Sequence, residues 1–276
     1  MNARLLFILL LFTIGALWYI IGYWRRKAGE AAFAAARLTE KSEERERYCR
    51  LAVMAGHRKA CRMFCLLHPE RFDGHSPHKP FKLRGIRISF YGYYYPSRYN
   101  ALLNDEQKAF CHSIYQFKQG DIHGIEFFKT CMNALQLKKR PYHIMFMPCS
   151  NWIKYGQRFK RLDWYIGKHR QDLTSGLYDV DICDARESLH EAKGGEKRIL
   201  ERNYLITGKI KGKEIIIIDD VLTTGQSVVD YKEEIERCGG KVVAAIFYGK
   251  TITLPHPLIV KLEVWGDYIT RFSKSN

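Results

Sequence analysis

The sequence predicts an α/β protein with a doubly wound, mostly parallel sheet, preceded by a transmembrane helix and a small helical region. Ile215 to Ile218 is a short, β-branched apolar run, which is typical of a strand buried on both faces. A second apolar run, Val242 to Tyr248, follows after a helix-compatible segment that ends at Gly239-Gly240. Strands and helices that alternate in this way favour a parallel sheet.

The N-terminus predicts a membrane anchor. Leu5 to Trp24 contains no charged residue and is long enough to cross a bilayer as a helix. Aromatic residues crowd its end, and Arg25 to Lys27 follow directly, so the positive-inside rule places the rest of the chain in the cytoplasm. A cleaved signal peptide is the competing interpretation, but no small-x-small cleavage site follows. We therefore expect residues 1–27 to anchor a single-pass membrane protein whose C-terminal domain is cytoplasmic.

Charge and cysteine content narrow the possible partners. The formal net charge is +16 at pH 7, and most of the excess lies in residues 1–139. An anionic membrane surface explains this placement, while nucleic acid remains possible but is not favoured. The eight cysteines are scattered without a Cys-x-x-Cys pair, which suits a reducing compartment better than a disulfide framework.

Residues 28–139 are expected to form a helical accessory region with a Tyr- and Pro-rich segment, Pro69 to Asn104. Tyr48 to Phe64 has a helix–Gly–helix pattern that resembles one unit of a Sel1-like repeat, and Gln107 to Leu135 is a weaker echo of it. Two units are fewer than a stable solenoid needs. A helical spacer packed on the main domain is the alternative interpretation.

Residues 140–276 are expected to form the main domain. We predict its elements in this order: a strand at His143 to Met147, a turn at Pro148 to Asn151, a helix through Arg158 to Ile166, a strand at Leu177 to Ile182, a basic segment at Arg186 to Arg202, a strand from Ile215, a helix to Cys238 and a strand at Val242 to Tyr248.

The strand at Ile215 leads into the residues that carry chemistry. Asp219 and Asp220 stand at its carboxyl end, and the small, hydroxyl-rich segment Thr223 to Ser227 precedes the next helix. Backbone N–H groups and hydroxyls at a helix N-terminus suit a phosphate, whereas the two carboxylates suit sugar hydroxyls or a divalent cation. A phosphorylated ribose is the simplest ligand that satisfies both halves.

Every position from Ile215 to Ser227 fits the phosphoribosyl pyrophosphate (PRPP) signature of type I phosphoribosyltransferases. The resemblance implies a type I phosphoribosyltransferase-like fold that binds PRPP and Mg²⁺. It assigns Asp219 and Asp220 to catalysis, with Mg²⁺ held near them indirectly. The implied 5′-phosphate-binding residues are Thr223, Thr224, Gly225, Gln226 and Ser227, and Cys149, Ser150 and Asn151 stand where the pyrophosphate loop is expected.

The basic segment has two interpretations: a mobile loop that covers the polyanion, or a solvated surface loop. Its candidate cations are Arg186, His190, Lys193 and Arg198, with Gly194-Gly195 among them. The neighbourhood of Pro148 to Leu162 is similar to the ComF-like branch of the family, in which a Pro-rich turn leads to an Arg before an amphipathic helix. Here Arg158-Phe159 and Leu162 occupy the comparable places.

Three functions stay open at this point. The first is a membrane-anchored enzyme that transfers phosphoribosyl from PRPP to a nucleobase or another nitrogen acceptor and releases pyrophosphate. The second is a regulatory module that binds PRPP or a nucleotide without turnover. The third is a ComF-like accessory protein of DNA uptake, although the zinc ribbon common in that branch is missing. The acceptor is not readable, and a homodimer is left open.

Overall fold

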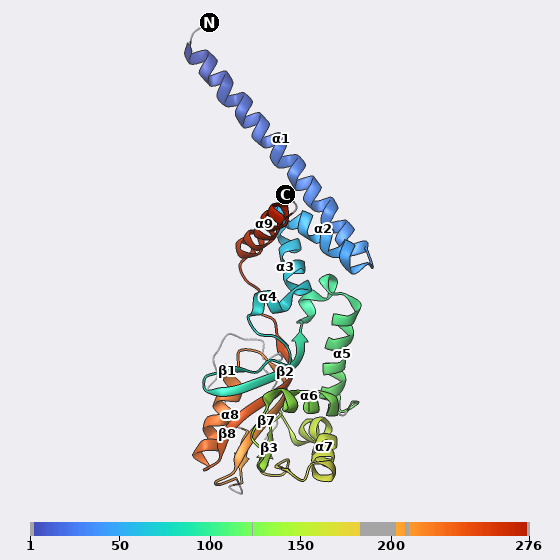
Figure 1. Cartoon of the computed structure of the whole chain (residues 1–276), viewed down its shortest axis with the longest axis vertical. Coiled ribbons are helices and arrows are strands. Elements are labelled where there is room, and N and C mark those ends of the chain that lie inside the picture. Colours follow the sequence, from blue (N-terminus) through green and yellow to red (C-terminus); the bar gives the residue numbers. More distant parts are fainter. Residues whose placement is uncertain (1–2, 123, 183–202, 208–209, 275–276) are drawn as a thin grey trace. The chain divides into compact units, whose positions relative to one another are not determined.

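The computed structural model describes residues 3–122, 124–182, 203–207 and 210–274, without the side chains of residues 3–6, 9 and 271–274. The chain divides into two compact units. The helical unit contains residues 1–74, 99–103 and 253–276, and the sheet unit contains residues 75–98 and 104–252. Each is therefore assembled from separate stretches of chain, which Figure 1 allows the reader to follow by colour.

The sheet unit contains a six-stranded sheet in the order β1-β2-β8-β7-β3-β4. Its elements are β1 (Phe81–Leu83), β2 (Ile86–Tyr94), α5 (Asp105–Gln119), α6 (Ile125–Leu135), β3 (Tyr142–Phe146), α7 (Trp152–His169), β4 (Leu173–Ser175), β5 (Val180–Ile182), β6 (Tyr204–Ile206), β7 (Glu214–Leu222), α8 (Gln226–Arg237) and β8 (Lys241–Thr251). All neighbouring strands of this sheet are parallel except β1, which runs antiparallel to β2. The predicted mostly parallel α/β sheet is confirmed.

Strand β7 lies inside the sheet because its sequence is apolar on both faces. The four isoleucines from Ile215 to Ile218 are fully buried, and β7 pairs with β8 on one side and β3 on the other. Figure 1 shows α8 on one side of the sheet and α5, α6 and α7 on the other. On the second side, Phe159 of α7 stacks on Phe146 of β3, with ring centroids 4.8 Å apart. Helices on both faces account for the unbroken apolar run.

The sheet begins earlier in the chain than Arg140, where the sequence suggested the start of the main domain. The Tyr-rich strand β2 pairs in parallel with β8, and α6 packs against both strands. The strand expected at Leu177 to Ile182 is shorter than predicted, since β5 begins at Val180 and forms a separate antiparallel ribbon with β6. The edge strand β4 was not predicted, because three residues give too short a pattern to read.

The helical unit contains α1 (Ala3–Leu38), α2 (Ser42–Met54), α3 (Arg58–Leu67), α4 (Pro69–Asp73), the end of the 3₁₀ helix η1 (Ser97–Leu102) and α9 (Pro257–Lys274). Helix α9 packs on α2 and α3 and buries Val260 and Val264. Asp267 accepts hydrogen bonds of 2.7 Å from both Arg50 and Arg71, and these guanidiniums hold its pKa well below the usual range. The C-terminal helix is thus tied by charge and by apolar contact to residues near the N-terminus.

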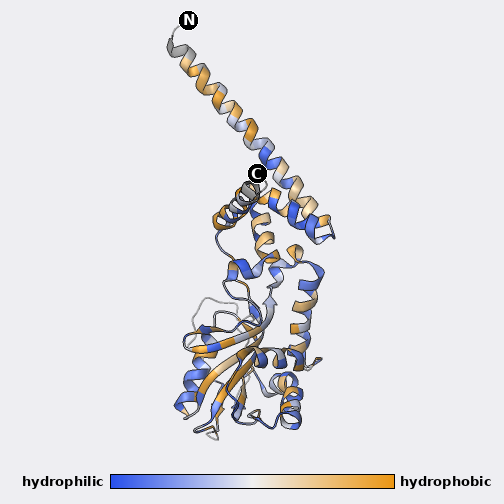
Figure 2. Cartoon of the chain, viewed as in Figure 1, coloured by the Kyte–Doolittle hydropathy of each residue, from blue (hydrophilic) through white to orange (hydrophobic). Residues whose placement is uncertain are grey.

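The transmembrane anchor and the Sel1-like repeats, which the sequence suggested for the N-terminal half, are not seen in the part of the chain that the structure describes. Among the described residues, no helix combines the length and the apolar character that a membrane span requires, so the transmembrane anchor expected at residues 1–27 is not supported. The side chains of Leu5, Leu6 and Leu9, on which that prediction partly rests, lie outside the described ones. Figure 2 shows the apolar colouring along the first part of α1. The cytoplasmic location stays a prediction.

The Sel1-like pairing is not seen as a stacked repeat. Helices α2 and α3 do form a helix–Gly–helix pair, with Gly56 at a φ of 93° between them. The weaker echo corresponds to α5 and α6, but these helices belong to the sheet unit, where α6 packs on strands. A repeat needs like units packed on one another. Here α2 and α3 pack on α9, whereas α6 packs on β2 and β8.

Removing part of the buried face of β7 is expected to destabilise the sheet unit. Ile217→Ala deletes three carbon atoms from a fully buried side chain and should lower the free energy of unfolding by about 2–5 kcal/mol. Ile217→Val, the matched control, should cost only about 0.5–1.5 kcal/mol. Urea unfolding followed by circular dichroism measures both changes. Equal midpoints for the Ala variant and the wild type would contradict the central place of β7.

Candidate functional site

The pairing of β3 with β7 brings two functional segments to one edge of the sheet. Ile144 lies opposite Ile216 and Phe146 opposite Ile218, and both strands run in the same direction. The N–H of Met147 still donates to the carbonyl of Ile218 at 2.9 Å, so the strands separate only after this point. The chain beyond Met147 therefore leaves the sheet beside the acidic pair, whereas β7 itself continues to Leu222 in its pairing with β8. Ligand-binding segments of open α/β sheets gather at this edge.

The two carboxylates at the end of β7 lie mostly out of water. Asp220 is 7% exposed, and the carboxylate of Asp219 accepts the backbone N–H of Asp220 at 2.7 Å. Burial raises the pKa of Asp219 to about 7, and the neighbouring Asp220 carboxylate adds to the rise. A buried carboxyl that holds its proton near neutral pH is a common feature of functional sites.

Two cations from neighbouring helices contact this acidic pair. Arg158 of α7 places Nη1 2.5 Å from Oδ2 of Asp220 and 3.8 Å from Oδ1 of Asp219. Lys118, near the end of α5, places Nζ 3.6 Å from the same Asp220 oxygen. The positive charge of Arg158 opposes the rise in the pKa of Asp219. These cations compensate the buried negative charge of the acidic pair, which would otherwise be costly.

Arg158 lies on a helix face that is otherwise apolar. Tyr155, Phe159 and Leu162 of α7 are fully buried around it, and the Arg158 side chain is only 16% exposed. The sequence places Arg158 only by resemblance, although a single arginine among apolar residues spaced three and four apart is itself a signal, since such a cation needs a buried anion. Lys118 gave no comparable signal, because it stands at the boundary of the buried face of α5.

The segment after β7 turns sharply into α8. Gly225 precedes the helix with a φ of 78°, a left-handed conformation that glycine adopts without steric cost. The side chains of Thr223, Thr224, Gln226 and Ser227 are exposed beside it. Within the described part of the chain, the hydroxyls of Thr223 and Ser227 form no hydrogen bond, whereas Gln226 bonds to Arg84 and Asp230 at 2.6 Å each. The predicted phosphate-binding segment is thus brought together and faces solvent.

The segment after β3 is held by Asn203, which the sequence did not single out, and by its own residue Asn151. Nδ2 of Asn203 donates to the carbonyls of Cys149 at 3.3 Å and Ser150 at 3.4 Å. Asn151 caps α7, since its side chain accepts the N–H of Lys154 at 2.9 Å. Burial raises the pKa of the Cys149 thiol to about 12, so this thiol is protonated at neutral pH and is no nucleophile.

A buried histidine in the same strand belongs to the fold rather than to this edge. His143 bonds to Asp179 at 2.8 Å and to Thr174 at 2.7 Å, near the start of β3. Burial and the nearby Lys213 lower its pKa, so the imidazole is neutral at pH 7. The predicted covering cations Arg186, His190, Lys193 and Arg198 lie outside the described residues.

Comparison with known proteins agrees with this arrangement. Residues 171–264 match the family model described as phosphoribosyl transferase domain. The match begins after β3 and α7 and therefore includes the acidic pair and the Thr223 to Ser227 segment, but not Cys149 to Asn151.

A short stretch of the chain is also similar in sequence to one curated protein. Over 57 residues the chain is 42% identical to an orotate phosphoribosyltransferase from Sulfolobus acidocaldarius. The matched stretch spans 20% of this chain and about a quarter of that enzyme, at 26% of its length. The comparisons support a phosphoribosyltransferase, a member of the glycosyltransferase class, without distinguishing a ComF-like branch.

The raised pKa of Asp219 predicts a pH-dependent stability. The folded protein keeps this proton up to a pKa of about 7, whereas the unfolded chain releases it near 3.8, the usual pKa of an aspartate. Stability from this group is therefore fully present below the unfolded pKa and is lost as the pH rises towards 7. We expect the free energy of unfolding of the wild type to fall, relative to Asp219→Asn, across this range. Urea titrations at several pH values measure it, and parallel curves would contradict the assignment.

Proposed function

We propose that the sheet unit binds PRPP together with Mg²⁺ and transfers its phosphoribosyl group to a nitrogen acceptor, releasing pyrophosphate. One observation carries the proposal: the buried acidic pair of β7, the exposed segment that opens α8 and the segment after β3 all lie at the same edge of the sheet. The match of residues 171–264 to the phosphoribosyl transferase domain supports it.

The 5′-phosphate is assigned to the segment Thr223 to Ser227. Its hydroxyls and backbone N–H groups surround the start of α8, where the helix dipole favours an anion. Glycine is needed at position 225 for this turn, since a side chain there would be strained and would meet Leu83. The oxygen atoms of Asp219 and Asp220, one step earlier on β7, then reach the ribose hydroxyls.

Asp219 and Asp220 also fit a magnesium environment. Mg²⁺ prefers oxygen ligands and keeps several waters, so one or two carboxylates and the substrate phosphates are enough to hold it. Among the described residues, no cluster of three or more His, Cys, Asp or Glu side chains could hold a metal ion. When bound, the ion would neutralise charge on the pyrophosphate leaving group. Arg158 holds the Asp220 carboxylate in position beside it.

The pyrophosphate is assigned to the segment Cys149 to Asn151. Asn203 donates hydrogen bonds to the carbonyls of Cys149 and Ser150, and these bonds fix the backbone of this turn. Among the described residues, the N–H groups of Cys149, Ser150 and Asn151 make no hydrogen bond to the backbone. As the bond to the anomeric carbon breaks, negative charge builds on the departing group, and preorganised N–H donors stabilise it. No covalent nucleophile is needed, because positioning and electrostatics suffice.

Removal of the acidic pair tests the ligand assignment. The double variant Asp219→Asn, Asp220→Asn should bind PRPP about a hundredfold more weakly, because two charge-assisted interactions are lost. Isothermal titration with PRPP and Mg²⁺ measures the change. The single variant Asp219→Asn keeps the Asp220–Arg158 ion pair and serves where the double variant is unstable.

A charge-matched control is available in the same unit. Asp105 and Glu106 are likewise adjacent acids, but both are exposed in the first turn of α5. The variant Asp105→Asn, Glu106→Gln removes the same charge and should bind PRPP as the wild type does. Unchanged affinity in the Asp219, Asp220 variant would show that these carboxylates do not hold the ligand.

The phosphate assignment predicts a selective loss of affinity for ribose 5-phosphate. Thr223→Ala together with Ser227→Ala should weaken its binding about tenfold or more, since hydrogen bonds to a charged phosphate are removed. Ser97→Ala with Thr207→Ala removes two exposed hydroxyls elsewhere in the sheet unit and should change nothing. Titration with ribose 5-phosphate, and with ribose as the uncharged comparison, gives both affinities. Equal losses for ribose and its phosphate would refute the assignment.

Release of pyrophosphate separates an enzyme from a sensor. The full chain, incubated with PRPP, Mg²⁺ and a panel of nucleobases and other nitrogen acceptors, should release pyrophosphate with at least one of them. PRPP binding without release would instead identify a regulatory module. The same panel names the acceptor class, which neither the fold nor the matched relative determines.

A further inference from the structure

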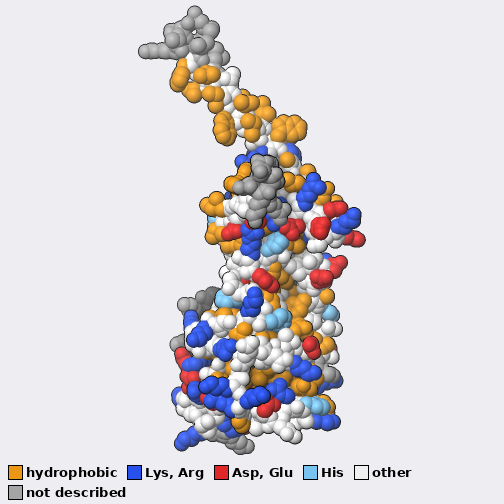
Figure 3. Space-filling view, viewed as in Figure 1, with side chains coloured by type: hydrophobic (Ala, Val, Ile, Leu, Met, Phe, Trp, Pro, Cys, Tyr) orange, Lys and Arg blue, Asp and Glu red, His pale blue; other side chains and the backbone are white. Residues whose placement is uncertain are grey.

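Helix α9 carries an exposed apolar stripe in the helical unit. Leu258, Leu262, Trp265 and Ile269 recur at helical spacing and are 57%, 64%, 45% and 63% exposed. The opposite face of the helix is the buried one that packs on α2 and α3. A helix that is apolar on both faces needs a second apolar environment outside the unit. Figure 3 shows hydrophobic side chains gathered on the surface at α9 and along α1.

Helix α1 adds a second exposed apolar surface to the same unit. Its described side chains from Phe7 to Ile21 are exposed and mostly apolar, and aromatic residues mark the end of the run. Trp18, Tyr19, Tyr23 and Trp24 are all 45% exposed or more. Exposed Trp and Tyr beside an apolar surface are typical of residues at the boundary between a membrane and water.

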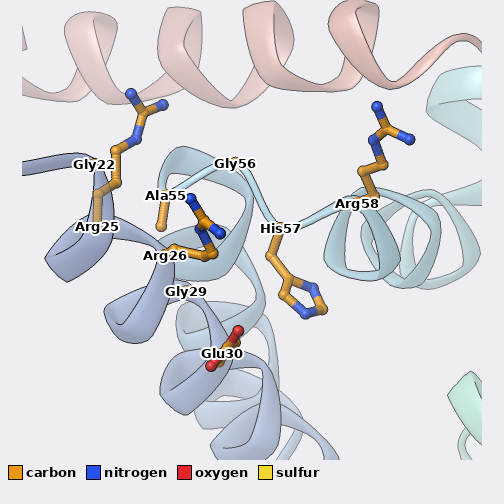
Figure 4. Close-up of a pocket in the computed structure, with 9 residues that line it drawn as sticks. All are labelled: Gly22, Arg25, Arg26, Gly29, Glu30, Ala55, Gly56, His57 and Arg58. Atoms are coloured by element: carbon orange, nitrogen blue, oxygen red, sulfur yellow. The ribbon is translucent and has the colours of Figure 1, made fainter. Parts of the chain in front are cut away.

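A cationic hollow lies directly after this aromatic group. It has a volume of about 400 Å³ and is lined by Gly22, Arg25, Arg26, Gly29, Glu30, Ala55, Gly56, His57 and Arg58. Figure 4 shows that Arg25 and Arg26 come from α1 and Arg58 from the start of α3. Glu30, the single carboxylate of the lining, is already in an ion pair of 3.1 Å with Lys27. The hollow is therefore positive and suits an anion.

The hollow connects to the α9 stripe through one residue. Nζ of Lys261 and Nη2 of Arg25 both lie close to Gly56, since a Cβ atom there would be 3.6 Å from the first and 3.8 Å from the second. Lys261 stands one turn from Leu258 and Trp265 on α9. His57 adds no charge, because burial and Lys59 lower its pKa and its ring stacks on Phe33 at 4.3 Å.

We propose that the helical unit binds the surface of an anionic phospholipid bilayer, with a lipid phosphate in the hollow of Arg25, Arg26 and Arg58. The apolar stripe of α9 then contacts the acyl region next to that headgroup. Charge complementarity and the continuity of apolar and cationic surface select this occupant. A nucleic acid would engage the cations but leave the stripe in water, and an acidic protein segment would leave the aromatic end of α1 uncovered.

Vesicle flotation of the full chain tests the proposal. The wild type should bind vesicles that contain phosphatidylglycerol and bind phosphatidylcholine vesicles much more weakly. Replacing Arg25, Arg26 and Arg58 together by Gln should weaken binding to the anionic vesicles roughly a hundredfold, since each cation near such a surface contributes about fivefold. Circular dichroism verifies that the variant keeps its helices.

A matched control separates the hollow from net charge. Arg37→Gln, Arg47→Gln and Arg62→Gln together remove the same charge from exposed positions of the helical unit and should lose clearly less affinity. Equal losses in the two triple variants would overturn the headgroup site. Equal binding of the wild type to anionic and uncharged vesicles would overturn it as well, as would binding of inorganic phosphate without vesicle binding.

The stripe is tested separately. Leu262→Ser with Ile269→Ser should weaken vesicle binding, because two apolar side chains no longer leave water on binding. Leu38→Ser with Leu51→Ser replaces two large aliphatic side chains at other exposed positions of the helical unit and should have a smaller effect. Vesicle binding that is unchanged by the α9 variant would show that the stripe does not contact lipid.

Discussion

The parallel pairing of β3 with β7 is the constraint on which the candidate site depends. A parallel ladder requires that both strands end at the same edge, so the polar segments that follow them share one opening. Because β7 is apolar on both faces up to Ile218, the first polar residues can appear only at that edge. The acidic pair is then buried at the boundary between the core and solvent, which raises the pKa of Asp219 and creates the need for Arg158.

Compensation of that buried charge links three helices to the sheet. Arg158 on α7 and Lys118 on α5 reach the acidic pair, while α8 begins beside it. A substrate that engages Asp219 and Asp220 must therefore compete with, or be oriented by, cations that are already in place. Under the proposed function Arg158 is a positioning residue, because it contacts the Asp220 carboxylate, to which the ligand is assigned.

The sequence predicts the parts of the fold that are encoded locally. The isoleucine run, the Gly225 turn and the helix that ends before Gly239 each carry their pattern within a few residues, and the structure has them where expected. The pairing of β2 with β8 joins residues that are far apart in the chain, and no local pattern reports it. Asn203 and Lys118 reach the site through contacts between distant parts of the chain, so the sequence could not place them there. Arg158 is different, because a lone cation on the apolar face of α7 is visible in the sequence.

The division of the chain has a consequence for synthesis. Chains emerge from the ribosome N-terminus first, and domains generally fold as units during this process. Residues 75–252, which hold all strands of the sheet, are translated before α9 begins at Pro257. Until then Arg50 and Arg71 have no Asp267 to bind. The apolar surfaces of α2 and α3 likewise lack their contact with α9. The nascent protein thus has all residues of the sheet unit before the helical unit, whose packing needs residues 253–276.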